Sequence, residues 1–247
     1  MGGASRGERK RRQEAAAQRL AAAGIQVPQK RSNPALVIVI AVVVVAVLVG
    51  GVVLYLRRSG TERVAPTYTA TAAGAVVTAG TGKAVVDVYE DFLCPNCEIF
   101  EKTYGNEIVT ALNEGKLTVR YHSIAILDSR STPPGYSTRA ANAALCAVPA
   151  GIYPTYHQKL FANQPSEGSA GLTDAQLVQL GTELGAKGDF AACVTGAKNA
   201  AAVTAETNKA IADPALQTNG QFGTPTVVAN GAMVDLNNTG WLKAIIG

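Results

Sequence analysis

Residues 84–97, AVVDVYEDFLCPNC, decide the fold of this chain. The first half of the stretch is apolar, β-branched and aromatic, which predicts a buried strand. The second half ends in two cysteines separated by two residues. A helical pattern of apolar residues follows as far as Leu112, with an interruption at Gly105. The stretch therefore predicts a strand that leads directly into a helix with both thiols at its start.

The two thiols would lie one helical turn apart, close enough to form a disulfide. Cys94 would sit beside unpaired backbone N–H groups and the positive end of the helix dipole, and both favour a thiolate over a thiol. Pro95 suits the first helical turn, where its missing N–H costs nothing. Cys94 is therefore the predicted nucleophile, and Cys97, shielded further inside the helix, is the predicted resolving thiol.

Charge divides the 247-residue chain into two parts. Residues 1–63 carry 11 Lys and Arg against 3 Asp and Glu, whereas residues 64–247 carry 11 against 15. Residues 1–34 hold few large apolar side chains, so a disordered basic tail is expected, with helix formation near Glu14 against anionic lipid as the alternative. The remainder is net acidic, so the basic isoelectric point is no argument for nucleic-acid binding.

Residues 35–56 form an uncharged run built mostly from Val, Ile, Leu and Ala. About 20 apolar residues span the hydrocarbon core of a bilayer, so this run predicts a transmembrane helix. Eight basic residues precede it and three follow shortly after, which places the N-terminus in the cytoplasm and the rest of the chain outside. A cleavable signal peptide is the alternative, but its apolar region is normally shorter. Residues 57–74 have a linker composition that would tether the folded part to the membrane.

Residues 75–247 are predicted to form one folded domain. A second strand over Leu117–Ile126 would lie parallel to the first, because a helix connects them. Residues 128–197 show several helical stretches and no convincing strand, and a long Ala-rich helix follows them. Near the C-terminus, Asn230 and Gly231 predict a hairpin turn between two short strands, before a closing helix.

These features resemble the DsbA-like branch of the thioredoxin superfamily, in particular its membrane-anchored actinobacterial members. The motifs that carry the resemblance are EDFLCPNC, the stretch Gly223-Thr224-Pro225-Thr226, and the additional cysteines Cys146 and Cys193. The resemblance implies an α/β thioredoxin-like fold with an all-helical insertion at about residues 128–197, preceded by one N-terminal transmembrane helix. It also implies a cis-proline at Pro225 that faces the cysteine pair, with the backbone of Thr224 binding an extended substrate segment.

The function expected from these residues is thiol-disulfide exchange through Cys94 and Cys97 on the extracytoplasmic side of the cell membrane. The protein would donate disulfides to exported cysteine-containing proteins, and the resemblance implies reoxidation by a quinone-linked membrane partner. No metal, nucleotide or flavin motif is present, so no cofactor is expected. The alternatives are a reductase or isomerase on the same fold, and a redox-silent adaptor that binds peptides.

Cys146 and Cys193 form a second pair, on two different predicted helices and 47 positions apart. A structural disulfide is expected between them. Two buried free thiols are one alternative, and a zinc site made from all four cysteines is another.

The remaining candidate groups receive no catalytic role. Glu90 and Asp91 are interpreted as solvated loop carboxylates, and His122 and His157 as ordinary surface or core histidines. The resembling family often keeps a buried acid six residues before the first cysteine, where this chain has Val88. The sequence therefore leaves the proton acceptor for Cys97 unassigned.

Overall fold

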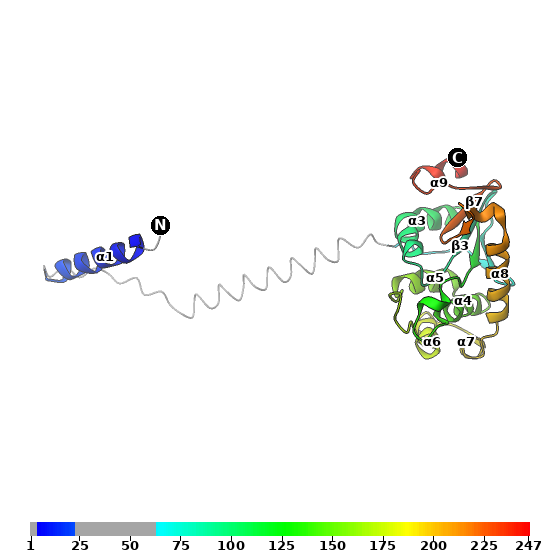
Figure 1. Cartoon of the computed structure of the whole chain (residues 1–247), viewed down its shortest axis with the longest axis horizontal. Coiled ribbons are helices and arrows are strands. Elements are labelled where there is room, and N and C mark those ends of the chain that lie inside the picture. The colour runs from blue at the N-terminus through cyan, green and yellow to red at the C-terminus, as the bar shows by residue number, and fades with distance from the viewer. Residues whose placement is uncertain (1–3, 23–62) are drawn as a thin grey trace. The chain divides into compact units, whose positions relative to one another are not determined.

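The computed structural model describes residues 4–22 and 63–247, which fall into two separate units, Met1–Glu62 and Arg63–Gly247 (Figure 1). The strands of the second unit are β1 (Ala70–Ala73), β2 (Val76–Gly80), β3 (Ala84–Glu90), β4 (Leu117–Ser123), β5 (Gln217–Thr218), β6 (Gln221–Phe222), β7 (Thr226–Ala229) and β8 (Ala232–Met233). Its helices are α3 (Pro95–Asn113), α4 (Tyr136–Ala147), α5 (Tyr153–Ala162), α6 (Asp174–Glu183), α7 (Phe190–Thr195), α8 (Ala200–Ala212) and α9 (Trp241–Ile246), with 3₁₀ turns η1 (Asp128–Arg130) and η2 (Pro214–Leu216).

The main sheet has the strand order β1-β2-β4-β3-β7-β8, and a separate hairpin joins β5 to β6. The central pair, β3 and β4, is parallel, and every other neighbouring pair in the sheet is antiparallel. The predicted parallel pair is therefore confirmed. The predicted turn at Asn230 and Gly231 is also confirmed, since both residues have positive φ and connect β7 to β8.

Helices cover both faces of the sheet. Side chains alternate along β3, so Val86, Val88 and Glu90 point to one face and are buried there. The Glu90 carboxylate contacts α5, and α5 packs against α3 on that face. On the opposite face, Tyr89 stacks on His122 of β4, and His122 contacts α8. The strand that carries the cysteine motif is thus enclosed between two helical layers.

Helices α4 to α7 form the all-helical insertion that the sequence predicts. Helix α4 lies at its centre, in contact with α5, α6, α7 and α8. Its alanines at positions 140, 141, 143 and 144 are completely buried, which lets the neighbouring helices approach closely. Both the thioredoxin-like α/β fold and the inserted helical subdomain are therefore present.

Helix α3 runs through Gly105 without a break, although the apolar pattern of the sequence is interrupted there. Gly105 is buried on the inner side of the helix, where a Cβ atom would lie 3.1 Å from Oε2 of Glu101. Glycine inside a helix costs about 0.5–1 kcal/mol relative to alanine. At this position it makes room for a buried carboxylate.

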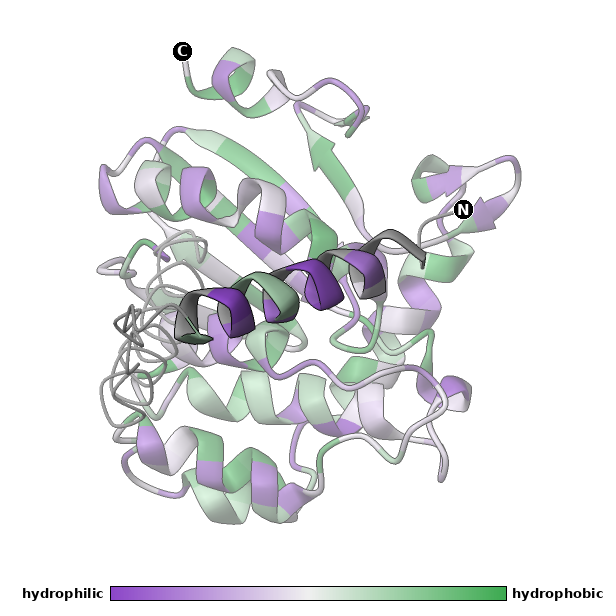
Figure 2. Cartoon of the chain, turned by 90° about the vertical axis from the view of Figure 1, so that its left-hand side faces the viewer, coloured by the Kyte–Doolittle hydropathy of each residue, from purple (hydrophilic) through white to green (hydrophobic). Residues whose placement is uncertain are grey.

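The first unit contains helix α1 (Ala4–Ala22), so a disordered tail is the wrong expectation over these residues. Alanine, arginine, glutamate and glutamine are strong helix formers, and Glu8 and Arg12 form an ion pair one turn apart. The helix is hydrophilic along most of its length (Figure 2). Within residues 4–22 and 63–247, no helix is both long and apolar enough to cross a membrane. The transmembrane helix predicted over residues 35–56 lies outside the described residues.

The linker predicted over residues 57–74 needs a correction, because residues 63–74 belong to the folded unit. Strand β1 pairs with β2 at the edge of the sheet. Before it, the backbone N–H of Val64 donates to Asn106 of α3 at 2.9 Å, and that of Thr67 donates to Asn113 at 2.7 Å. The small residues that suggested a linker therefore form an edge strand, held by backbone hydrogen bonds that composition does not reveal.

Candidate active site

A short buried loop connects β3 to the cysteine helix. Asp91 is completely buried, and its two carboxylate oxygens accept the backbone N–H groups of Leu93 and Leu127, each at 2.9 Å. Its carbonyl accepts the N–H of Cys94 at 2.9 Å. Glu90 is 1% exposed. The interpretation of Glu90 and Asp91 as solvated loop carboxylates is therefore wrong, and Asp91 instead fixes the direction in which the chain enters α3.

Cys94 is the N-cap of α3, Pro95 occupies the first turn, and Cys97 lies one turn further along the buried side. Both cysteines are free thiols in this structure and both are buried, Cys94 at 5% exposure and Cys97 at 1%. The Cys94 Sγ atom lies 3.2 Å from the carbonyl oxygen of Thr224, 130 positions away in the sequence. The fold thus brings the first cysteine of the motif against the Thr224-Pro225 stretch, whose peptide bond is cis.

The two thiols have opposite acidities. Hydrogen bonding from the Cys97 thiol, aided by Thr224 and by backbone N–H groups at the helix start, lowers the pKa of Cys94 to about 6 despite its burial. Burial raises the pKa of Cys97 well above its ordinary value, and the nearby Cys94 sulfur raises it further. Near neutral pH, Cys94 is therefore a thiolate and Cys97 a thiol.

We expect the thiolate absorbance of the reduced protein at 240 nm to titrate with a midpoint near pH 6. A thiol whose pKa is lower in the folded state than in the unfolded state stabilises the folded state. This contribution is fully present above the pKa of the unfolded state and is lost as the pH falls through the pKa of the folded state. The reduced protein should therefore gain stability relative to the oxidised protein between about pH 6 and pH 9. The Cys94→Ser variant is the control for the assignment of the signal. A midpoint at pH 8 or above would contradict the geometry.

A groove of about 840 Å³ opens beside the cysteine motif, between α3, the β5–β6 hairpin and the loop before α9. Ile99, which is 58% exposed, lies on its α3 side, and Thr224 and Pro225 lie on the opposite side. The remaining lining residues are Asn96, Phe100, Thr103, Tyr104, Leu216, Thr218, Gln221, Phe222, Gly223, Thr226, Leu236, Asn237 and Thr239. This mixture of apolar side chains and accessible backbone suits an extended polypeptide segment.

Cys146 and Cys193 are joined by a disulfide between α4 and α7, with their Cα atoms 5.8 Å apart. The Asn199 side-chain amide lies 3.3 Å from the Cys146 sulfur and 3.6 Å from the Cys193 sulfur. This bridge lies within the helical insertion, on elements other than those that carry Cys94 and Thr224. The structure thus separates the four cysteines into two independent pairs.

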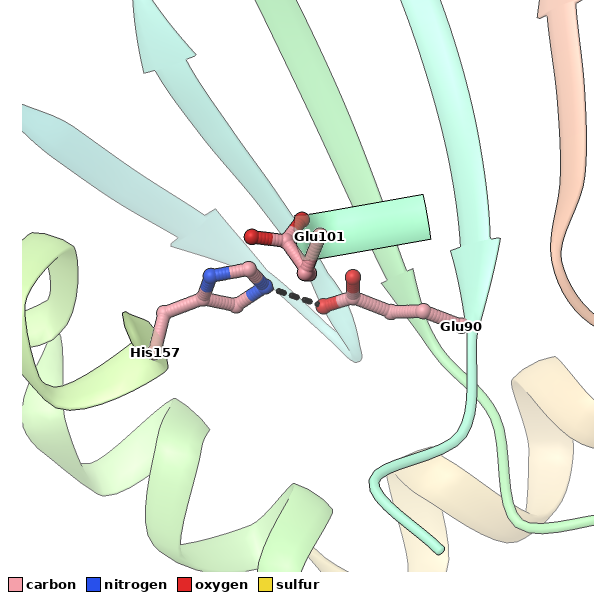
Figure 3. A group of neighbouring side chains, drawn as sticks. All are labelled: Glu90, Glu101 and His157. Atoms are coloured by element: carbon pink, nitrogen blue, oxygen red, sulfur yellow. Dashed lines mark hydrogen bonds and ion pairs between the residues drawn. The ribbon is translucent and has the colours of Figure 1, made fainter. Parts of the chain in front are cut away.

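Glu90, Glu101 and His157 form a buried cluster that sequence reasoning missed (Figure 3). They come from β3, α3 and α5, and their side-chain polar atoms lie within 4.8 Å of one another. The Nε2 atom of His157 is 2.7 Å from Glu90 Oε1, and Phe92, Tyr121 and Phe161 enclose the imidazole ring.

The three groups of this buried cluster do not all keep their charges in the interior. Burial, opposed by the nearby His157 and aided by the Glu90 carboxylate, raises the pKa of Glu101 to about 7. Burial lowers the pKa of His157, but the two carboxylates overcome that effect and raise it above its ordinary value. The cluster therefore retains protons near neutral pH.

His122 belongs to a different network on the other face of the sheet. Its ring nitrogens lie 2.7 Å from Glu206 of α8 and 2.9 Å from Asp87 of β3, and Arg120 pairs with Asp87. The network joins β3, β4 and α8. Because the sheet separates it from α3, we assign it a structural role.

Comparison with known proteins gives one family and several solved relatives. The family model described as Thioredoxin matches residues 73–246. The serine/threonine-protein kinase PknE of Mycobacterium tuberculosis is 32% identical over 181 residues, covering 70% of this chain. The chain spans about a third, 31%, of the length of that relative.

Among solved structures, reduced DsbA from Mycobacterium tuberculosis is 32% identical with a TM-score of 0.58, over 66% of this chain and 81% of that chain. The reduced disulfide oxidoreductase DsbG from the same organism is 34% identical with a TM-score of 0.58, over 66% and 76%. The thiol-disulfide oxidoreductase MdbA from Corynebacterium diphtheriae has a TM-score of 0.62 over 75% and 96%, and at 19% identity it is similar in fold alone.

Proposed function

Because the chain belongs to the thioredoxin family and is a DsbA-like thiol-disulfide oxidoreductase, we propose that Cys94 and Cys97 are its redox pair and that it donates disulfides to exported proteins. The observation that carries this proposal is the contact between Cys94 and Thr224. It places a thiol of low pKa against backbone that borders a groove.

Oxidation of a client proceeds in two exchanges. A client thiolate attacks the Cys94 sulfur of the Cys94–Cys97 disulfide, a new disulfide forms between client and Cys94, and the electron pair of the broken bond leaves with Cys97. A second client thiolate then attacks the client sulfur of this mixed disulfide, and Cys94 leaves as a thiolate. A leaving thiol of low pKa speeds the second exchange and stabilises the reduced enzyme, so the low pKa of Cys94 favours the oxidising direction.

The groove supports broad client specificity. Backbone groups of Thr224 and the neighbouring Gly223 are available to pair with an extended chain, and such pairing does not depend on the client side chains. Ile99 and Phe222 add apolar contact surface on the two sides of the groove. Unfolded segments that contain cysteine are the clients that fit this chemistry.

The proposed location is the outer side of the cytoplasmic membrane. Its support is the uncharged 22-residue run at 35–56, which separates a basic N-terminal segment from the net acidic folded unit. On this proposal, residues 1–34 are a cytoplasmic tail and the folded unit from Arg63 faces outward. A membrane-bound, quinone-linked enzyme would reoxidise Cys94 and Cys97, since an anchored donor meets membrane partners readily.

Two measurements test this proposal on the purified folded unit. We expect the oxidised protein to oxidise a peptide that contains two cysteines. In a glutathione titration, we expect a reduction potential between those of DsbA and thioredoxin, about −120 and −270 mV. In cells, a Cys97→Ala variant should accumulate mixed disulfides on Cys94, because the resolving thiol is absent. The Cys94→Ala/Cys97→Ala double variant is the matched control and should trap nothing.

The outcomes separate the alternatives. A potential at or below that of thioredoxin would reverse the direction of exchange and indicate a reductase. A Cys94–Cys97 disulfide that resists mild dithiothreitol, together with no trapped client, would indicate a redox-silent adaptor. A client distribution unchanged by removal of residues 35–56 would contradict the proposed anchoring.

A further inference from the structure

The buried cluster of Glu90, Glu101 and His157 takes no part in the exchanges written above. We propose that these three side chains bind one divalent transition-metal ion, and that Zn²⁺ is the member of this class that fits them. The three residues belong to β3, α3 and α5, so no sequence motif brings them together. A bound ion would join the inserted helical subdomain to the sheet and to the helix that carries the redox pair.

The three side chains point toward one another from three different elements (Figure 3). One possible ligand atom from each lies within 4.8 Å of the other two. Bonds of about 2.0–2.2 Å to imidazole nitrogen and carboxylate oxygen place the ligand atoms of a tetrahedral zinc ion about 3.4 Å apart. A small shift of the flexible glutamate side chains reaches this spacing. Gly105, which has no Cβ atom, leaves the Glu101 carboxylate room to move.

Three buried oxygen atoms in this region have no hydrogen-bond partner among residues 4–22 and 63–247. They are Glu90 Oε2, Glu101 Oε1 and the phenol oxygen of Tyr153. Tyr153 is 1% exposed and precedes His157 by one turn of α5, and the centres of the two rings are 5.7 Å apart. Buried polar groups normally have partners, and buried charges are paired or coordinate metals. A metal ion would satisfy both carboxylates, with the Tyr153 oxygen beside its fourth position.

The charges and the ligand atoms of the cluster select the metal. Two ionised carboxylates carry two negative charges, which one divalent ion neutralises, so the occupied site buries no net charge. Ca²⁺ takes about six to eight oxygen ligands and Mg²⁺ about six, and a site with an imidazole nitrogen among three protein ligands does not provide them. Zn²⁺ accepts imidazole nitrogen and carboxylate oxygen together in a four-coordinate site.

A small pocket leads toward the cluster. Its volume is about 180 Å³, and Tyr68 and Tyr153 are among its lining residues. Burial raises the pKa values of both phenols, and the Glu90 and Glu101 carboxylates raise them further, so the two rings stand beside the cluster. An ion in the pocket reaches the cluster when these rings move aside. Arg63 is the positive group that acts on Glu101, but it is exposed, so water and salt screen its repulsion of an entering ion.

Zinc titration of the purified, metal-free full-length chain in its oxidised form tests the proposal. Both cysteine pairs are then bridged, so no thiolate of the four cysteines competes for the ion. We expect isothermal titration calorimetry to give one equivalent of Zn²⁺ per chain with a dissociation constant of about 1 µM or tighter. Glu101→Gln and His157→Gln each remove one ligand and should weaken binding by at least about 100-fold.

Matched controls distinguish this site from other acidic and histidine groups. His122, the only other histidine of the sequence, lies between Asp87 and Glu206. His122→Gln should bind Zn²⁺ as wild type does, and so should Glu107→Gln, the same change elsewhere on α3. Loss of binding in His122→Gln together with retention in His157→Gln would overturn the proposal. Wild-type binding weaker than about 1 µM would also overturn it.

Two measurements on wild type cover the case in which a cluster variant fails to fold. Zn²⁺ should move the NMR signals of the His157 ring and leave those of His122 in place, with His122→Gln assigning the two sets. At a free Zn²⁺ concentration of about 100 times the dissociation constant, the midpoint of thermal unfolding should rise by about 5 °C or more. Unmoved His157 signals or an unchanged midpoint would overturn the proposal. None of these measurements uses peptide oxidation, so their outcome is independent of the proposed function.

Discussion

Replacing Cys94 with serine is expected to abolish disulfide exchange. Loss of an enzyme nucleophile lowers rates by on the order of 10³-fold or more, and here the hydroxyl also forms no mixed disulfide at all. The physical reason is that the thiolate of Cys94 is both the sulfur that the client attacks and the group that leaves in the second exchange. The measurement is oxidation of the two-cysteine peptide under conditions in which the wild type completes several turnovers with glutathione disulfide as oxidant.

The folded state should tolerate this substitution, because serine is nearly isosteric and the oxygen still reaches the Thr224 carbonyl. Below pH 6, where the Cys94 thiolate adds no stability, thermal unfolding of the reduced variant should therefore stay within a few degrees of the reduced wild type. The informative control is Cys97→Ala, which cannot form the Cys94–Cys97 disulfide. Its Cys94 thiolate should still attack a client disulfide, release one client thiolate and stay attached to the other client sulfur, because no neighbouring thiol displaces it. Substantial peptide oxidation by Cys94→Ser would show that Cys146–Cys193 performs the exchange, and the assignment of the redox pair would be wrong.

The sequence predicts the strand and helix around Cys94 because each depends on local pattern. The apolar run before the motif is long enough to define β3, and Pro95 marks the helix start. The meeting of Cys94 with Thr224 depends instead on how β3 pairs with β7, 130 positions away. That contact was expected only through resemblance to a family, since no local pattern in the sequence encodes it.

The buried cluster shows where local reasoning fails. Side chains alternate along a strand, so Glu90 is expected on the same buried side of β3 as Val86 and Val88. Residues four apart lie on one side of a helix, so Glu101 is expected on the same buried side of α3 as Cys97. Both signals are in the sequence, but a carboxylate is presumed to be solvated until a partner is known. The partner, His157, lies on the inserted helices, and its position is set by tertiary packing alone.

The hairpin that borders the groove is also hard to predict from the sequence. Asn219 and Gly220 have positive φ and form the turn of the β5–β6 hairpin that borders the groove. An Asn-Gly pair is a strong hairpin signal. However, the flanking strands have only two residues each, too few to show an alternating pattern. The hairpin is therefore recognisable only from its place beside α8 and Pro225.

Replacing both Cys146 and Cys193 with alanine is expected to lower the free energy of unfolding by about 2–4 kcal/mol, because the disulfide restricts the unfolded chain across 47 positions. Helix α7 has only six residues, and helices this short are not stable by themselves. Without the bridge, its attachment to α4 depends on the Asn142 side chain, which donates to the Val194 carbonyl at 3.1 Å, and on apolar packing. Urea unfolding should shift its midpoint by about 1–2 M, from a slope of about 2 kcal/mol/M.

Peptide oxidation by this double variant should remain within about threefold of wild type at 25 °C, since neither α4 nor α7 lines the groove beside Cys94. The matched control is Cys94→Ala/Cys97→Ala, which removes two thiols from α3 and leaves the helical insertion bridged. Below pH 6, where the Cys94 thiolate adds no stability, its urea midpoint should stay near that of the reduced wild type with Cys146–Cys193 intact. An unchanged midpoint in the Cys146→Ala/Cys193→Ala variant would show that packing alone holds α7. If that variant stays folded but no longer oxidises the peptide, the conformation of the redox pair depends on the helical insertion. That result would contradict the separation of the two sites.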